Sequence, residues 1–560
     1  SQINGSLLAN GQVYLMNPAG VYFGQTAMVD VGRLYAVGGS LSKEDFFAGL
    51  NRFTGLTGEV NNAGSIRGEM VALIGRSVAN TGTIVSPGGF IGLVSGDQVL
   101  LGQDGSSIFV DAGRSDPTTT PATGTAVANT GTIDAGRGTA VLAAGDFYSI
   151  AITHDGRLAG RDVRLQGQGR GDVLVSGSID TSAPGIGGHL EITGERVGLV
   201  GHASINASGP AGGGTILVGG DYQGGNAAVR NAARTFVGTD VTLNANATTA
   251  GDGGKVIVWA DEATRFHGTI TARGGAAGGD GGLAEVSGKG WLEYRGLADL
   301  TAALGRTGTL LLDPTDITIN GAGVDANPTF GSFSGGIFDG GANNTSVISI
   351  GTGGGDTNNT LLKQLAAANV VVTTTSTGAG TGNLTVSDVI SYNSANSLTL
   401  TAGNTLLISS AITNAGAGDL NLNSGAGIGI GAALSTTGAV NINAGTSLAI
   451  GANVSGTAVA ITNSGGAVTR SAGTITATTL TLNGSGNVAL GAGRLDTNLG
   501  TLILNKTGGN VFLNDTGALA IQGSTTGNLD LTASGALSQA AGLTVGAALA
   551  SAAPRIITIG

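Results

Sequence analysis

Cysteine is absent from this chain of 560 residues, and charged residues make up only 11% of it and aromatic residues 4%. The lack of cysteine excludes a disulfide framework and thiolate metal sites. It suits a reducing compartment, and equally a chain that must pass unfolded through a narrow pore, where a disulfide loop would block passage. So little charge and so few aromatic residues indicate one repeated unit rather than several distinct enzyme cores.

Proline is also scarce, at 9 residues, although glycine reaches 104. Because glycine shows no period of three, a collagen triple helix is excluded. Disorder is excluded as well, since hydrophobic residues make up 41% of the chain and the formal net charge is only −11. The acidic balance and the lack of a basic cluster argue against nucleic acid as a partner, because phosphate binding requires a basic face.

No apolar run approaches the roughly 18 residues that a membrane-spanning helix requires, so we expect no membrane-spanning segment. The chain begins at Ser1, without methionine or a signal peptide. We therefore expect it to be a processed or trimmed fragment.

A short alternating pattern recurs through the C-terminal part of the chain. Two aliphatic residues flank one residue, then Asn or Thr follows, and Gly comes within three positions. The pattern begins at Leu398, Leu420, Val440, Val459, Leu480, Leu502 and Leu529. A two-residue alternation inside a period of about 20 residues predicts one short strand per coil of a solenoid.

Two other versions of the repeat occupy the first half. Glycine runs beginning at Gly187, Gly212, Gly253 and Gly281 precede strand-like segments. Earlier, the segments 60–66, 78–84 and 127–133 share Asn and Gly between two aliphatic residues. We expect these Asn and Gly residues to adopt positive φ where a coil turns.

These repeats predict an all-β fold, a right-handed parallel β-helix with short extra-helical loops and one or two short helices. Equivalent aliphatic residues should form inward columns, with Leu420, Val440, Val459 and Leu480 in one column, and Asn, Thr and Ser should form ladders at the corners. The helices are expected at 42–50 and 360–368, and an extruded loop at 111–125.

Composition divides the chain further. A low-complexity stretch separates two solenoid segments, and no Glu follows Glu293. We predict β-helix repeats over residues 76–315, an interruption with a short helix over 316–375, and repeats of about 20 residues over 376–560.

The segment Asn17-Pro18-Ala19-Gly20-Val21-Tyr22-Phe23-Gly24 resembles the Asn-Pro-Asn-Gly-Ile-Phe-Gly signature of the filamentous-haemagglutinin class of two-partner secretion exoproteins. The pattern that follows the signature in that family is also present: an alternating strand over 27–31, acidic residues and paired Phe over 42–50, and Asn51-Arg52-Phe53. The match is specific over about residues 1–75. Segments 254–262 and 310–319 look like stretches found in large members, and residues 320–560 match only in style.

The resemblance implies that residues 1–75 are the C-terminal part of a secretion domain, which a dedicated outer-membrane transporter recognises. It implies an extracellular or cell-surface protein that folds outside the cell, attaches the cell to other surfaces or forms surface fibres, and is not an enzyme. Host or other cell-surface glycans or proteins, and self-association into fibres, are further partners to expect. Ala19 stands where the family has Asn, and Val21 where it has Ile, which weakens a role for the side chain at position 19.

Two groups of residues are candidate sites. Asn17, Pro18 and Gly20 are candidates for transporter recognition, although Asn-Pro before Gly is also an ordinary β-turn. Arg170-Gly171-Asp172 is a weak candidate for an adhesion tripeptide, against a plain coil segment. We expect no catalytic residue, cofactor or metal: the four His residues lack metal-site spacing and are expected at solvated positions, and the Gly-Asp runs lack the tandem calcium-binding pattern.

A β-helical polysaccharide lyase or hydrolase is the main alternative, because such enzymes group acidic and basic residues on one strand face. Charge is densest in the middle third, at Asp261, Glu262, Arg265, Arg273 and Glu285. A third alternative is a matrix or filament-forming structural protein without an adhesive target.

Overall fold

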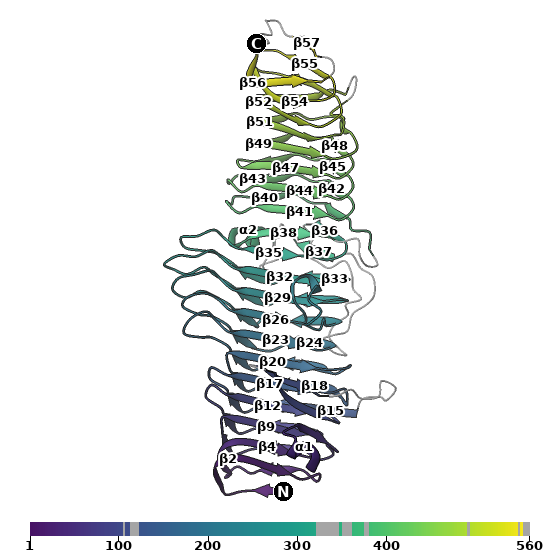
Figure 1. Ribbon diagram of the computed structural model, residues 1–560. Coiled ribbons are helices and arrows are strands. Elements are labelled where there is room, and N and C mark those ends of the chain that lie inside the picture. The colour runs from purple at the N-terminus through teal and green to yellow at the C-terminus, as the bar shows by residue number, and fades with distance from the viewer. Residues whose placement is uncertain are drawn as a thin grey trace. The chain divides into compact units, whose positions relative to one another are not determined.

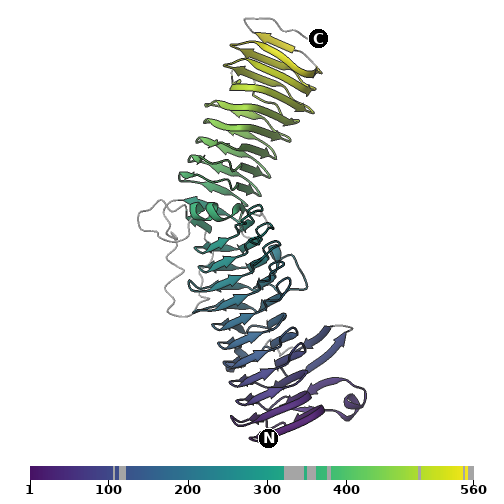
Figure 2. The ribbon, with the colours of Figure 1, turned by 90° about the vertical axis from the view of Figure 1, so that its left-hand side faces the viewer.

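The computed structural model describes residues 1–104, 107–112, 122–320, 346–349, 361–374, 380–489, 493–546 and 549–552. They fall into two compact units. Unit 1 contains Ser1–Gly288 and Gly296–Gly308, and unit 2 contains Lys289–Arg295 and the described residues from Thr309 onward. Each unit is a stack of coils, seen from two sides in Figures 1 and 2.

Each coil of unit 1 contributes one strand to each of three parallel faces, here called A, B and C. Face A contains β1 (Gln2–Ile3), β3 (Val21–Phe23), β7 (Val60–Asn62), β10 (Val78–Asn80), β15 (Ala122–Asn129), β18 (Tyr148–His154), β21 (Asp172–Val175), β24 (Arg196–Leu199), β27 (Arg234–Val237) and β30 (Ala263–Phe266). Face B contains β8 (Ser65–Arg67), β11 (Thr83–Val85), β16 (Thr132–Asp134), β19 (Arg157–Ala159), β22 (Ser178–Asp180), β25 (Ser204–Asn206), β28 (Thr242–Asn244), β31 (Thr269–Thr271) and β34 (Leu297–Asp299). Face C contains β9 (Met70–Gly75), β12 (Phe90–Ser95), β17 (Thr139–Ala144), β20 (Asp162–Gly167), β23 (His189–Thr193), β26 (Thr215–Val218), β29 (Lys255–Ala260) and β32 (Leu283–Gly288), and the long strands β2 (Ser6–Met16) and β4 (Met28–Val37) serve faces B and C together.

Unit 2 has the same three faces. Face A contains β36 (Ile317–Asn320), β39 (Leu384–Val386), β42 (Leu406–Ile408), β45 (Ile428–Ile430), β48 (Leu448–Ile450) and β50 (Val468–Arg470). Face B contains β40 (Ile390–Tyr392), β43 (Ile412–Asn414) and β46 (Leu434–Thr436), and face C contains β35 (Thr309–Leu312), β38 (Asn369–Thr373), β41 (Leu398–Ala402), β44 (Leu420–Ser424) and β47 (Ala439–Ala444). The longer strands β49 (Val454–Asn463), β51 (Ile475–Gly484) and β52 (Leu495–Lys506) continue both B and C, and β54 (Leu519–Thr525) continues C.

The alternation of apolar and polar residues places every second side chain inside the stack. In β41 and β44, burial alternates residue by residue, and the inward leucines are at most 1% exposed. Leu420 pairs with Val440, Val440 with Val459, and Val459 with Leu480, all in parallel register. The predicted inward column and the parallel β-helix are therefore confirmed.

The last repeat of the predicted series belongs to another face. Leu502 pairs with Ile521, whereas Leu529 pairs with Val511, which continues face A. Leu529 therefore does not extend the column that contains Leu480. Its spacing from Leu502, longer than that of the other repeats, is the sequence sign of this change of face.

The glycines of the N-terminal repeats do not adopt positive φ, and that expectation was wrong: Gly64, Gly82 and Gly131 are absent from the described residues with positive φ. They are required because the preceding coil lies directly against them. A Cβ at Gly82 would lie 2.1 Å from the Gly64 carbonyl oxygen, and a Cβ at Gly131 would lie 2.1 Å from the Gly82 carbonyl oxygen. The close stacking of coils therefore requires glycine at the corner between face A and face B.

The asparagines beside these glycines form a ladder inside the stack. The Asn62 Nδ2 donates to the Asn80 Oδ1 at 2.8 Å, and the Asn80 Nδ2 donates to the Asn129 Oδ1 at 2.7 Å. The three side chains are at most 1% exposed. Because buried amides must be hydrogen-bonded, the ladder fixes the vertical register of these coils.

His154 ends the asparagine ladder, so its expected solvated position was wrong. It is 0% exposed, and its Nδ1 lies 3.0 Å from the Asn129 Nδ2 and its Nε2 lies 3.0 Å from the Ser178 carbonyl oxygen. An amide nitrogen only donates, so Nδ1 must accept, and the imidazole is neutral with its proton on Nε2. Burial lowers the pKa of His154 below 6.5, against weaker opposing effects of the Ser178 carbonyl and Asp155.

An extra-helical sheet covers face C of the first coils (Figure 2). It is antiparallel and contains β5 (Ser40–Leu41), β6 (Asn51–Thr54), β13 (Val99–Asp104) and β14 (Ser107–Asp111). Buried Phe53, Val99 and Leu101 of this sheet join a second core with Tyr35 and Ile74, which point outward from the coils. Two short helices, α1 (Lys43–Phe47) and α2 (Leu361–Ala367), lie in the predicted segments.

The other predicted interruptions fall largely outside the described residues. The extruded loop predicted over 111–125 meets the end of β14 and the start of β15, and 113–121 are not described. The interruption predicted over 316–375 likewise has only 316–320, 346–349 and 361–374 described. The proposed domain boundaries stay predictions.

Protonation of His154 should destabilise unit 1 in acid. The native state favours the neutral imidazole, so its contribution is complete above about pH 6.5 and is lost as pH falls below that value. We expect His154→Asn, which continues the asparagine ladder, to remove up to about 1.4 kcal/mol of pH dependence per pH unit below 6.5. Urea unfolding between pH 5 and 8 measures this. His202→Asn, at an exposed position, is the control, and equal pH slopes for both variants would contradict the prediction.

Candidate functional site

The segment Asn17–Gly20 is a tight turn between β2 and β3. The Gly20 N–H donates to the Asn17 carbonyl oxygen at 2.8 Å, and the Ala19 N–H donates to the Asn17 Oδ1 at 3.0 Å. Asn is suited to this position because its side chain can satisfy the backbone two residues on. Pro18 and Ala19 are exposed, so the tip of the turn faces solvent.

The base of the turn is held by the coil that follows. The Thr57 Oγ1 donates to the Pro18 carbonyl oxygen at 3.0 Å, and the Val21 N–H donates to the Glu59 carbonyl oxygen at 2.9 Å. Gly20 has φ +100°, and a Cβ there would lie 2.7 Å from the Glu59 carbonyl oxygen. Gly20 is thus required by both its backbone angle and the close approach of the next coil.

Large exposed apolar side chains are concentrated near this turn in the sequence. Among the described residues, those between positions 8 and 50 are Leu8, Met16, Tyr22, Met28, Phe46, Phe47 and Leu50. Met16 immediately precedes the turn and is 41% exposed, and Tyr22 in β3 is 40% exposed. Clusters of exposed apolar residues mark interaction sites in soluble proteins.

Helix α1 presents the most exposed of these side chains. The Ser42 Oγ caps the helix by accepting the Asp45 N–H at 3.0 Å. Phe46 packs edge-on against Tyr14, with 5.5 Å between ring centroids, whereas Phe47 is 84% exposed.

Helix α1 packs through Phe46 on a pair of stacked tyrosine rings. Tyr14 and Tyr35 stack with 4.6 Å between their centroids, and Asn51 joins them by accepting from the Tyr14 hydroxyl at 3.0 Å and donating to the Tyr35 hydroxyl at 3.3 Å. Burial raises the pKa of Tyr35. Because these contacts hold Phe46 against Tyr14, the next residue of α1, Phe47, points into solvent.

The Arg170-Gly171-Asp172 triplet is held at the start of β21. The Asp172 carboxylate accepts two hydrogen bonds from Arg196, at 2.6 and 3.0 Å, and its side chain is 15% exposed. Arg170 pairs with Asp146 at 3.4 Å. Burial raises the pKa of Asp172 in spite of Arg196. The side chains of Arg170 and Asp172 thus both form ion pairs within unit 1. The adhesive role of the triplet stays a prediction.

The charged residues of the middle third also have structural partners. Asp261 accepts from the Trp259 Nε1 at 3.0 Å, and Glu262 pairs with Arg234 at 2.9 Å. Glu285 is 0% exposed and accepts the Gln223 N–H at 2.9 Å.

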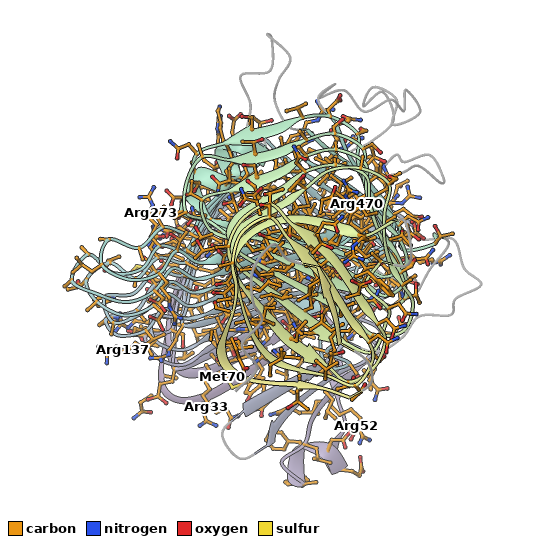
Figure 3. All side chains as sticks on the ribbon, turned by 90° about the horizontal axis from the view of Figure 1, so that it is seen from above. Arg33, Arg52, Met70, Arg137, Arg273 and Arg470 are labelled. Carbon is orange, nitrogen blue, oxygen red and sulfur yellow. The ribbon has the colours of Figure 1, made fainter. Side chains whose placement is uncertain are left out.

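Arg273, which lies at the periphery in Figure 3, forms an ion pair with Asp299. Burial raises the pKa of Asp299, but hydrogen bonds from Arg273 and Thr301 hold it below its usual value. Arg265, the remaining member of the charged set, lies in β30. The ion pairs of Glu262 with Arg234 and of Arg273 with Asp299 join neighbouring coils.

The part of the chain that the structure describes contains no group of three or more His, Cys, Asp or Glu side chains arranged to hold a metal ion. Within the same residues, none of the helices has the length and apolar character needed to span a membrane.

Comparisons with known proteins point to the N-terminal part of the chain. The family model described as TPS secretion domain matches residues 1–183. Among solved structures, the HMW1 secretion domain from Haemophilus influenzae is 27% identical, and the match covers 54% of this chain and 80% of that chain with a TM-score of 0.44. No curated protein matches the chain.

Sequence reasoning located the turn and the paired Phe residues but missed which Phe is exposed. Phe47 carries little packing, so Phe47→Ser should change the free energy of unfolding by less than about 0.5 kcal/mol. Tyr35, 2% exposed and stacked on Tyr14, is the matched comparison. Tyr35→Ala should cost about 3 to 5 kcal/mol. Urea unfolding measures both, and a large loss for Phe47→Ser would assign that side chain a structural role.

Proposed function

We propose that the Asn17–Gly20 turn, Met16 and Tyr22 beside it, and the exposed Phe47 of α1 contribute to the surface that an outer-membrane transporter recognises, because they lie within residues 1–183, which match the TPS secretion domain family. The chain is a two-partner secretion exoprotein, as the resemblance of residues 17–24 indicated, and it is exported across the outer membrane. We further propose that, once outside, it serves as an adhesive or structural surface protein rather than as an enzyme.

The observation that carries the proposal is the coincidence of three features inside the matched residues. The turn is rigid at its base and exposed at its tip, α1 presents Phe47 to solvent, and Met16 and Tyr22 flank the turn. A recognition surface needs apolar side chains held rigidly in solvent, because a partner then loses little conformational freedom in covering them. Elsewhere in unit 1, exposed large apolar residues are few among the described positions.

The location of this surface at the first coils also suits folding outside the cell. A single coil of about 20 residues loses roughly 20 to 40 kcal/mol of conformational free energy when ordered, at 1 to 2 per residue. Its few inward aliphatic residues recover only part of that cost. A new coil is therefore stable only on a coil already formed, and the first coils act as the template for the rest.

What favours a structural role is that Asp261, Glu262 and Glu285 are bound by Asn231, Arg234 and Gln223 of other coils, since catalytic carboxylates must reach a substrate. Long stacks of polar, sparsely charged coils suit a protein that extends from the cell and makes repeated weak contacts.

Replacing Asn17 and Pro18 together should lower export. Asn17→Ala with Pro18→Ala removes the side chain that accepts the Ala19 N–H and changes the exposed tip. We expect the exported fraction of the full-length precursor to fall several-fold when protein in the medium is compared with precursor retained in the periplasm.

The matched control is Asn483→Ala with Gly484→Ala in unit 2. It is sterically severe, because a Cβ at Gly484 would lie 2.1 Å from the Asn463 carbonyl oxygen. It should nevertheless leave export largely intact, since coil interactions are between nearest neighbours. Equal export from both variants would mean that residues 17–20 are an ordinary turn and would refute the proposal.

A further inference from the structure

The outer surface of face C in unit 2 carries two columns of polar side chains. Parallel register stacks the outward residues of β41, β44, β47, β49, β51 and β52, which follow one another in Figure 1. The first column is Thr399, Asn421, Asn441, Ala460, Thr481 and Ile503, and the second is Thr401, Asn423, Asn443, Thr462, Asn483 and Asn505. All of these side chains are half-buried or exposed. We call this surface the ladder face.

Hydrogen bonds between neighbouring coils hold the amides of the ladder face in one orientation. In the second column, the Asn443 Nδ2 donates to the Asn423 Oδ1 at 2.7 Å, and the Asn423 Nδ2 donates to the Thr401 Oγ1 at 3.1 Å. In the first column, the Asn441 Nδ2 donates to the Asn421 Oδ1 at 2.8 Å. Each donor is the nitrogen of the later coil, so the amides are aligned along the stack.

Each aligned asparagine keeps donor and acceptor groups that the ladder does not use. An Asn amide has two N–H donors and two acceptor lone pairs on its oxygen. The ladder uses one donor of each asparagine and one lone pair each of Asn421, Asn423 and Asn483. One donor and at least one lone pair per asparagine therefore remain, and neighbouring coils of the stack are about 4.8 Å apart. Because the side chains are already ordered by the ladder, a ligand that binds them loses little side-chain entropy.

The chemistry of the ladder face limits what can bind it. Neither column contains a charged residue. Nucleic acids and acidic polysaccharides need cations to neutralise them, so this face does not suit either. A second copy of the chain needs a buried apolar core in the interface, and the two columns of the ladder face offer only Ala460 and, in β52, Ile503 as apolar side chains.

A neutral polymer rich in hydroxyl groups fits all of these conditions. Hydroxyls both donate and accept, so they match the unused donor and lone pair of each amide. A repeating polymer laid along the stack can form the same weak contact on successive coils, and such contacts combine by multivalency. We propose that the ladder face binds a neutral polysaccharide, extended parallel to the stack of unit 2. This inference deepens the proposed adhesive role and rests on it for the extracellular setting.

Affinity electrophoresis of the purified chain tests the proposal. The probes are a linear neutral β-glucan, a neutral galactomannan and, as the acidic comparison, polygalacturonate. We expect retardation by at least one neutral polymer and none by polygalacturonate. Titration calorimetry with oligomers of the retarding polymer should give an affinity that rises at least tenfold between oligomers spanning about two coils and about six.

The test variant is Asn423→Ala with Asn443→Ala, which removes two adjacent amides of the second column. It should weaken binding at least tenfold. Its control is Ser435→Ala with Ser455→Ala, which removes a comparable stacked pair on face B, where the two hydroxyls lie 3.4 Å apart. The control should bind as the unaltered chain does. Asn443→Lys, at an exposed position, is a second test that leaves the interior intact and should also weaken binding.

Several results would overturn the proposal. They are a lack of retardation by every neutral polymer, equal or tighter binding of polygalacturonate, binding that all the variants retain, and concentration-dependent dimerisation that the ladder variants abolish. The last result would assign the face to a second copy. Because the purified chain is used, these outcomes are independent of export, so failure of transporter recognition and failure of the ladder face are distinguishable.

Discussion

Direct backbone contact between one coil and the next is the constraint on which the rest of this structure depends. The glycines at the corner after face A in unit 1 leave no room for a Cβ, since the nearest carbonyl oxygen of the preceding coil would lie 2.1 Å away at both Gly82 and Gly131. At that separation each strand pairs with its counterpart residue for residue, as Ile84 does with Ile66 and Ile133. Inward side chains then form columns and outward side chains form ladders, and both functional proposals depend on those outward side chains.

The sequence predicted what depends on periodicity alone. Alternation inside the repeat was enough to place Leu420, Val440, Val459 and Leu480 in one inward column, because strand geometry permits only two sides. It was not enough for Leu529, because the alternation is the same in strands of face A and face C, and only the longer spacing from Leu502 marks the change of face. The role of Gly82 was also misjudged, since a glycine required by close approach cannot be distinguished in sequence from one required by positive φ. Asn, Thr and Ser were expected in ladders at the corners, yet Asn421 and Asn441 lie along the outer surface of a face.

The candidate site was predictable only in part. The motif located the turn at Asn17, but the exposure of Phe47 depends on where α1 packs, which in turn depends on Tyr14, Tyr35 and Asn51 from separate strands. His154 was misjudged for a related reason. Its position in the column of Asn62, Asn80 and Asn129 follows from strand register over an irregular spacing, and a lone histidine in sequence gives no sign of such a ladder.

Each strand pairs with its counterpart in the next coil residue for residue. Cysteine cross-linking tests this pairing directly, because the chain has no cysteine of its own. Thr413 pairs with Ser435 on the outer surface of face B. Thr413→Cys with Ser435→Cys should form an intramolecular disulfide on mild oxidation, since directly opposed residues lie within disulfide range. Thr413→Cys with Thr437→Cys, two residues further along, should not, because diagonal neighbours are about 7 to 8 Å apart. Peptide mass spectrometry distinguishes the two products, and equal or preferential cross-linking at position 437 would contradict the account.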